Sequence, residues 1–208
     1  MSTQRILYTF MHGFACDASF WEELVSSFSF PSIVWDRGYY ANPYIEYQKA
    51  ELHIGVGHSL GLIHLLESPY PFDIYIGIQS FVDFIGGNPQ RKTELDIMKR
   101  QLTLNIQQTL RRFCKRGGLP LPHTIVNEEQ LLIDYEKLYN RYDRLTQDKV
   151  LYLCATKDDI IVPLSLIENN FPTHQIQIAP DAKHALGYVQ VDYLRQYLES
   201  IGNTLLTT

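Results

Sequence analysis

A serine lies at the centre of the pentapeptide GHSLG, residues 57–61, where its neighbours could make its hydroxyl reactive. Before it, residues 53–56 are partly β-branched and nearly uncharged, which is typical of a short buried parallel strand. After it, apolar residues recur at helical spacing up to Ser68-Pro69. The pattern predicts a strand, a sharp turn and a helix, with Ser59 at the apex of the turn. This is the context in which G-x-S-x-G presents a nucleophilic serine.

The two flanking glycines are expected in such a turn for a steric reason, because only residues without a Cβ can pack so close to a strained serine. The alternative is an ordinary bend between a strand and a helix, as in a nucleotide-binding fold. No G-x-G-x-x-G or G-x-x-x-x-G-K-[ST] pattern follows a predicted strand in this sequence. Its absence weakens the phosphate-binding version of that alternative.

A serine hydroxyl is a poor nucleophile until an imidazole accepts its proton and a carboxylate orients that imidazole. Candidates for both groups follow later strands. Residues 149–155 lead into Asp158 and Asp159, and residues 175–178 lead into PDAKHA, which contains His184. The order serine, aspartate, histidine, each at the carboxyl end of a strand, predicts a catalytic triad.

The elements around these residues alternate between strands and helices, which predicts an α/β fold. We expect a mostly parallel sheet of about six strands with helices on both faces and without an N-terminal antiparallel hairpin. The predicted strands cover residues 6–11, 32–35, 53–56, 73–79, 149–155 and 175–178, and the predicted helices cover 19–28, the segment after Ser59, 165–171 and 191–201.

Residues 88–145 interrupt this alternation, because they are charged, glutamine-rich and helical in pattern. We expect residues 1–87 and 146–208 to form the core. Residues 88–145, the lid segment, are then a small helical insertion over the carboxyl ends of the strands.

The composition is that of one ordinary globular domain: 208 residues, 45% hydrophobic, 20% charged and a net charge of −5. The first apolar run is too short for a signal peptide, and no run has the length needed to span a bilayer. The three cysteines (Cys16, Cys114 and Cys154) are widely spaced, which argues against a disulfide framework or a zinc site. We therefore expect a cytoplasmic monomer that needs no metal or organic cofactor.

Four stretches of the chain resemble the α/β-hydrolases and fall in that fold's order: HGFACDASFW after the first strand, GHSLG, DDIIVP and PDAKHA. Within this superfamily the chain is most similar to the pimeloyl-[acyl-carrier-protein] methyl ester carboxylesterases of bacterial biotin synthesis. It departs from them in its short lid, in the missing hairpin and in His58, where the best-known members have Trp.

The resemblance implies roles for individual residues. Phe14 and Leu60 would supply the two backbone N–H groups of an oxyanion hole. In the lid segment, a helical stretch would contact the substrate through Phe113, Arg111, Arg112 and Arg116.

The acid has three candidates. The usual superfamily spacing D-x-[LI]-V-P selects Asp159 over its neighbour Asp158. Asp83, after the strand predicted at residues 73–79, is a lesser alternative, because some hydrolases take their acid from that position.

Charge is distributed unevenly along the chain. Residues 84–118 hold eight basic and two acidic residues, a net charge of +6 that leaves −11 for the rest. Such a basic segment predicts an acidic partner. An acyl carrier protein is acidic and delivers its acyl chain on a long arm, so it suits this segment better than nucleic acid, for which no binding motif is present. The alternative is a solvated helical face.

The sequence thus predicts a serine carboxylesterase with Ser59, Asp159 and His184 as its triad, and the resemblance implies the methyl ester of pimeloyl-acyl-carrier protein as its substrate. Two alternatives remain. One is a carboxylesterase or thioesterase for small free esters. The other is a non-catalytic member of the fold that binds a ligand in the same pocket.

Overall fold

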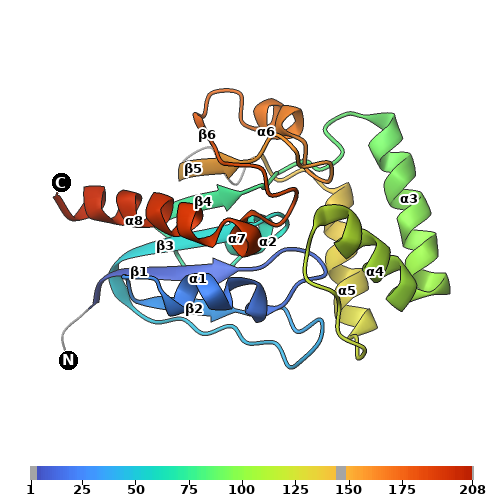
Figure 1. Cartoon of the computed structure of the whole chain (residues 1–208), viewed down its shortest axis with the longest axis horizontal. Helices are drawn as coiled ribbons and strands as arrows, with labels where there is room; N and C mark the ends of the chain where they lie inside the picture. Colours follow the sequence, from blue (N-terminus) through green and yellow to red (C-terminus); the bar gives the residue numbers. More distant parts are fainter. Residues whose placement is uncertain (1–3, 144–148, 208) are drawn as a thin grey trace.

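The computed structural model describes residues 4–143 and 149–207, and its centre is a parallel β-sheet (Figure 1). Within the described residues the sheet has six strands in the order β2-β1-β3-β4-β5-β6, and every neighbouring pair is parallel. The strands are β1 (Gln4–Met11), β2 (Ser32–Trp35), β3 (Ala50–His58), β4 (Ile74–Ile78), β5 (Val150–Ala155) and β6 (Ile176–Ile178). The predicted parallel sheet of about six strands is confirmed.

Helices cover both faces of this sheet. The chain leaves β1 through α1 (Glu22–Ser26) toward β2, and leaves β3 through α2 (Gly61–Leu66) in the opposite direction toward β4. Because crossovers between parallel strands are right-handed, α1 and α2 lie on opposite faces. The C-terminal helix α8 (Val191–Thr207) packs beside α1 (Figure 1). The remaining helices of the core are α6 (Leu164–Asn170) and α7 (Leu186–Val189).

The single helix predicted at residues 19–28 is wrong. A 3-10 helix, η1 (Ala18–Trp21), precedes the short α1. The hydroxyls of Ser26 and Ser27 donate to backbone carbonyls of the preceding turn. Such local bonds compete with helical hydrogen bonding, which explains why the helix ends here.

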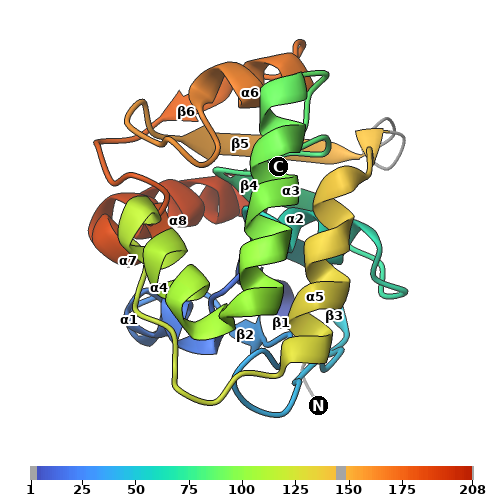
Figure 2. The same ribbon diagram turned by 90° about the vertical axis from the view of Figure 1, so that its right-hand side faces the viewer.

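The described part of the lid segment lies across the carboxyl ends of the strands, the end toward which the arrows point in Figure 1 and which faces the viewer in Figure 2. It contains α3 (Pro89–Leu104), α4 (Ile106–Gly117), α5 (Glu128–Glu136) and the 3-10 helix η2 (Lys137–Tyr139). Asn105 separates α3 from α4, because its side chain accepts the N–H of Gln108 and caps the second helix. The predicted boundary between residues 145 and 146 lies outside the described residues.

A buried carboxylate attaches the lid segment to the core. Asp134, on α5, has no solvent exposure and accepts two hydrogen bonds from the guanidinium of Arg37, at 2.8 and 2.7 Å. It also accepts the hydroxyl of Tyr39 at 2.9 Å. Charge-assisted bidentate pairs of this kind fix orientation as well as distance. The position of α5 is therefore fixed by the loop that follows β2.

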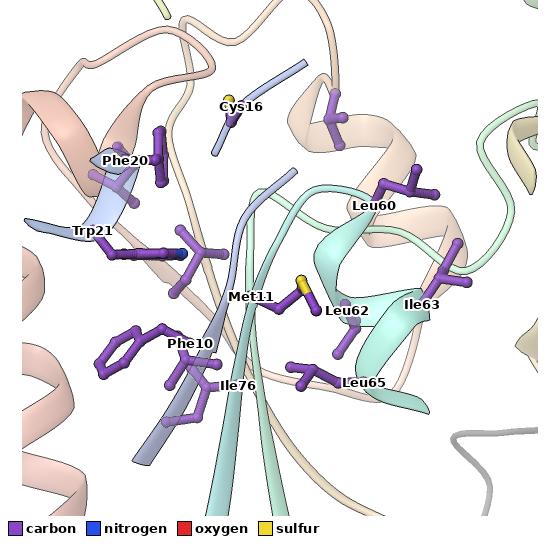
Figure 3. Close-up of a cluster of buried hydrophobic side chains, with 14 of the residues drawn as sticks. Phe10, Met11, Cys16, Phe20, Trp21, Leu60, Leu62, Ile63, Leu65 and Ile76 are labelled. Atoms are coloured by element: carbon purple, nitrogen blue, oxygen red, sulfur yellow. The ribbon is translucent and has the colours of Figure 1, made fainter. Parts of the chain in front are cut away.

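Close packing beneath the turn at Ser59 explains the two glycines of the pentapeptide. A Cβ on Gly57 would overlap the backbone of Leu62, and a Cβ on Gly61 would overlap the carbonyl of Met11. Figure 3 shows the side chains of Met11 and Leu62 close together beneath this turn. Within the described part of the chain, no helix has the length and apolar character needed to cross a bilayer.

Candidate active site

Ser59 occupies the strained turn that the sequence predicts. Its φ of 54° lies in the left-handed region, which a residue with a side chain adopts at a cost in free energy. Its N–H donates to the carbonyl of Ile78 at 2.9 Å, so β4 holds the turn in place. The hydroxyl makes no hydrogen bond to any residue that the structure describes. Catalytic hydrogen bonds are often long before substrate binds.

His184 and Asp159 form a buried pair. Nδ1 of His184 lies 2.7 Å from Oδ2 of Asp159, and both side chains are 1% exposed. The other oxygen of Asp159 accepts the N–H groups of Ile161 and Val162, at 2.8 and 3.0 Å. The carboxylate is thereby fixed, and the imidazole that donates to it presents Nε2 as the ring atom free to take a proton.

The two alternative acids lie elsewhere. Asp158 accepts the backbone N–H groups of Ala182 and Lys183, at 3.0 to 3.1 Å, and so ties down the loop before His184. Asp83 accepts the N–H of Gly86 and lies 3.5 Å from Arg141. Of the three carboxylates, Asp159 is the one that contacts the imidazole of His184.

His58 links the serine turn to the histidine loop. Its Nε2–H donates to the carbonyl of His184 at 2.8 Å, and the two rings lie 4.7 Å apart between centroids. Burial, followed by the neighbouring His184, lowers the pKa of His58 well below its ordinary value, so the ring is neutral. A Cβ placed on Gly13 would lie 3.0 Å from Cβ of Ser59. The first-strand loop, the serine turn and the histidine loop therefore meet at one point.

Two backbone donors are available at this point. The N–H groups of Phe14 and Leu60 donate to no other group in residues 4–143 and 149–207. The loop that carries Phe14 is held by His12, whose Nε2 accepts the N–H of Arg37 at 3.0 Å. The proton of His12 is then on Nδ1, which donates to the carbonyl of Gly13 at 2.9 Å.

A cavity of 260 Å³ opens between α3 and α4, beside the loop that carries Asp159. Arg112, Phe113 and Arg116, three of the four predicted substrate contacts, line it, whereas Arg111 does not. The remaining lining residues are Phe84, Glu94, Leu95, Ile97, Met98, Gln101, Thr109, Ile160 and Ile161. The ring of Phe113 also packs edge-on against that of Phe14, with centroids 5.6 Å apart. The cavity thus adjoins the loop that carries Phe14, one of the two donors.

Sequence reasoning missed Gln79, which follows β4 and is completely buried. Its side-chain amide contacts Asp159, Thr156 and the backbone of the histidine loop. The signal was weak, because a glutamine at the end of an apolar strand has no motif of its own.

Among the described residues, His53 is another buried histidine outside this cluster. His53 lies 2.7 Å from the hydroxyl of Thr9, within the sheet. Among the residues that the structure describes, no group of three or more His, Cys, Asp or Glu side chains is placed to hold a metal ion.

The fold is that of the α/β-hydrolases, as comparison with solved structures shows. An esterase from Exiguobacterium antarcticum superposes with a TM-score of 0.78 at 13% identity, over 97% of this chain and 92% of that one. MenH from S. aureus gives 0.72 at 13% identity, over 96% and 94%. An epoxide hydrolase from Bacillus megaterium gives 0.67 at 16%, over 97% and 95%. No protein-family model and no curated protein matches the sequence.

Proposed function

We propose that this protein is a serine carboxylesterase in which Ser59 is the nucleophile, His184 the general base and Asp159 the acid that orients it. Ser59 Oγ attacks the ester carbonyl while Nε2 of His184 takes the hydroxyl proton. The negative charge that develops on the carbonyl oxygen is held by the N–H groups of Phe14 and Leu60.

The tetrahedral intermediate then expels the alcohol, which receives the proton from His184 and leaves an acyl-enzyme. Water attacks the acyl group, gives a proton to the same imidazole, and the acid is released as Ser59 recovers its proton. Asp159 orients the imidazole and stabilises the imidazolium that forms in each step.

The observation that carries this proposal is the buried hydrogen bond of 2.7 Å between His184 and Asp159, on the same edge of the sheet as the strained Ser59. A histidine fixed by a carboxylate has one tautomer and one orientation, which is what proton transfer from a serine requires. The likeness to a protein described as an esterase supports the same reaction.

For the substrate we propose an acyl ester carried by an acyl carrier protein, specifically the methyl ester of the pimeloyl form. The supporting observation is the distribution of free positive charge. Lys92 and Lys99 on α3 pair with Asp96 and Glu136. The four cations of α4 have no acidic partner among the described residues: Arg111, Arg112, Lys115 and Arg116. An unpaired basic helix beside an apolar cavity suits an acidic carrier that delivers an acyl chain.

The experiment compares the parent protein with Ser59→Ala on two esters, p-nitrophenyl butyrate and pimeloyl-acyl-carrier-protein methyl ester. Ser59→Ala should lose at least about 1,000-fold in kcat on both, since triad members act as a unit. The circular dichroism spectrum should be unchanged. Parental activity in this variant would refute the serine mechanism. For the parent, KM should be far lower for the carrier-linked ester than for the same ester without its carrier, and equal values would refute the carrier.

A further inference from the structure

Backbone strain in this molecule is concentrated at the proposed active site. In the described chain, the non-glycine residues with positive φ are Ala15 (61°), Ser59 (54°), Gln79 (48°) and Lys183 (50°). Ala15 follows the proposed oxyanion donor Phe14, Ser59 is the proposed nucleophile, and Lys183 precedes His184. Strained backbone persists where the surrounding structure over-determines it, and it clusters at functional sites. Gln79 shares this strain, yet the proposed mechanism gives it no part.

The side-chain amide of Gln79 is held by several hydrogen bonds. Its N–H₂ group donates to Oδ2 of Asp159 at 2.9 Å, the same oxygen that lies 2.7 Å from His184. It also donates to the carbonyl of Lys183 and lies 3.2 Å from the hydroxyl of Thr156.

The opposite end of the amide contacts the other side of the histidine. Oε1 of Gln79 accepts the N–H of Leu186 at 3.1 Å. The amide orientation follows from these partners, because a carboxylate and a carbonyl need a donor and an N–H needs an acceptor. One buried side chain therefore contacts the acid and both flanks of the loop that carries the base.

We propose that Gln79 is a positioning residue of the esterase reaction, which holds Asp159 and the His184 loop at a fixed separation so that the imidazole stays aligned with Ser59. This inference rests on the proposed function. It assigns Gln79 no contact with the substrate. Its amide is uncharged, so it can donate a hydrogen bond to the carboxylate and leave the negative charge in place. An arginine or lysine would neutralise that charge.

A charge introduced at position 79 would lie close to several ionisable groups. Asp159 lies at hydrogen-bond distance, Asp158 holds the backbone of Lys183, and His58 donates to the carbonyl of His184. On β5, the carbonyl of Cys154 accepts the N–H of Gln79, and burial raises the pKa of the Cys154 thiol to about 12. Of these groups, the carboxylate of Asp159 is the one that would repel a second carboxylate directly.

Two substitutions test the proposal. Gln79→Met keeps the length of the side chain and removes every hydrogen bond of the side-chain amide, so kcat for p-nitrophenyl butyrate should fall roughly 10- to 100-fold with KM nearly unchanged. Gln79→Glu places a second carboxyl group within hydrogen-bond distance of Asp159, and the two groups repel each other when both are ionised. Its kcat relative to the parent should therefore decline as pH rises, a trend that a merely structural role would not produce.

The matched control is Ser80→Ala, the next residue of the same strand end. Ser80 is buried and its hydroxyl donates to the carbonyls of Gly57 and Ile78, and in the described chain it forms no hydrogen bond with Asp159 or His184. This variant should keep the parental pH profile of kcat.

The rate at which a fluorophosphonate labels Ser59 separates the two proposals. If the parent is labelled at Ser59 while Gln79→Met and Gln79→Glu are labelled at the parental rate, Gln79 has no positioning role. If the parent itself is not labelled, the serine mechanism fails instead. Loss of the downfield imidazole N–H resonance of His184 in Gln79→Met, with a parental far-ultraviolet spectrum, would support the proposal independently of turnover.

Discussion

Two adjacent carboxylates in the loop after β5 have different hydrogen-bond partners, and we infer different roles for them from this difference. Asp159 accepts two N–H groups of its own loop and contacts His184, whereas Asp158 accepts two N–H groups of the histidine loop. One acts on the imidazole, and the other on the backbone that carries it.

This division predicts unequal effects of two substitutions. Asp159→Asn should lower kcat for a free ester by about 1,000- to 10,000-fold with little change in KM, because the amide favours the wrong histidine tautomer. Asp158→Asn keeps a carbonyl oxygen for the same N–H groups, so kcat should fall less than about tenfold. Steady-state kinetics of both variants provide the measurement. A larger loss for Asp158→Asn would mean that the acid is assigned wrongly.

At the scale of a single element, α4 has two pairs of cations that differ in what they face. Arg112 and Arg116 line the cavity, and Arg111 and Lys115 do not. All four are exposed and have no acidic partner among the described residues. Each pair lies one helical turn apart, so the two are matched in charge and spacing.

Reversing the charge of each pair therefore distinguishes two roles for these cations: docking of an acidic carrier protein, and direct contact with the acyl substrate. If an acidic carrier covers the helix, Arg111→Glu with Lys115→Glu should raise KM for the carrier-linked ester roughly tenfold or more, as should Arg112→Glu with Arg116→Glu. Hydrolysis of a small uncharged ester should hardly change in either double variant. Equal losses on both esters would show that these side chains support the lid or shape the pocket, and an effect of the cavity pair alone would indicate a direct contact with the acyl substrate.

At the scale of the whole molecule, packing between the sheet and its helices lowers the pKa of three of the buried histidines. Burial lowers the pKa of His53, His58 and His64, in the last case to about 3. The unfolded chain takes up a proton at each of these sites below about pH 6.5, whereas the native chain does not. The contribution of these neutral histidines to the free energy of unfolding is therefore complete above about pH 6.5. It is lost as the pH falls toward their pKa values in the folded protein.

We expect the free energy of unfolding to decrease on acidification well before carboxylates titrate. His64 alone should contribute a slope of about 1.4 kcal/mol per pH unit below its unfolded pKa. His64→Gln should therefore show a shallower pH dependence in urea unfolding between about pH 6 and pH 4.5. His123→Gln is the control, since the side chain of His123 is 60% exposed. Parallel slopes for His64→Gln and the parent would contradict the prediction.

Sequence alone determined the features of this protein that have a local cause. Short apolar, nearly uncharged runs define the strands, and the glycines around Ser59 mark its turn, because each of these signals lies within a few residues. The order of the candidate serine, aspartate and histidine was readable for the same reason: each follows a strand, and parallel strands end on one edge of the sheet.

Only the tertiary structure decided which distant groups meet. Asp159 rather than Asp158 or Asp83 contacts His184, because the loop after β5 turns one carboxylate inward and the next toward the backbone of the histidine loop. Gln79 gains its importance from residues 77 to 107 positions away in sequence. Such contacts depend on loop geometry and strained backbone, which residue types and spacing do not encode, and so they become visible only when the strand ends are assembled in space.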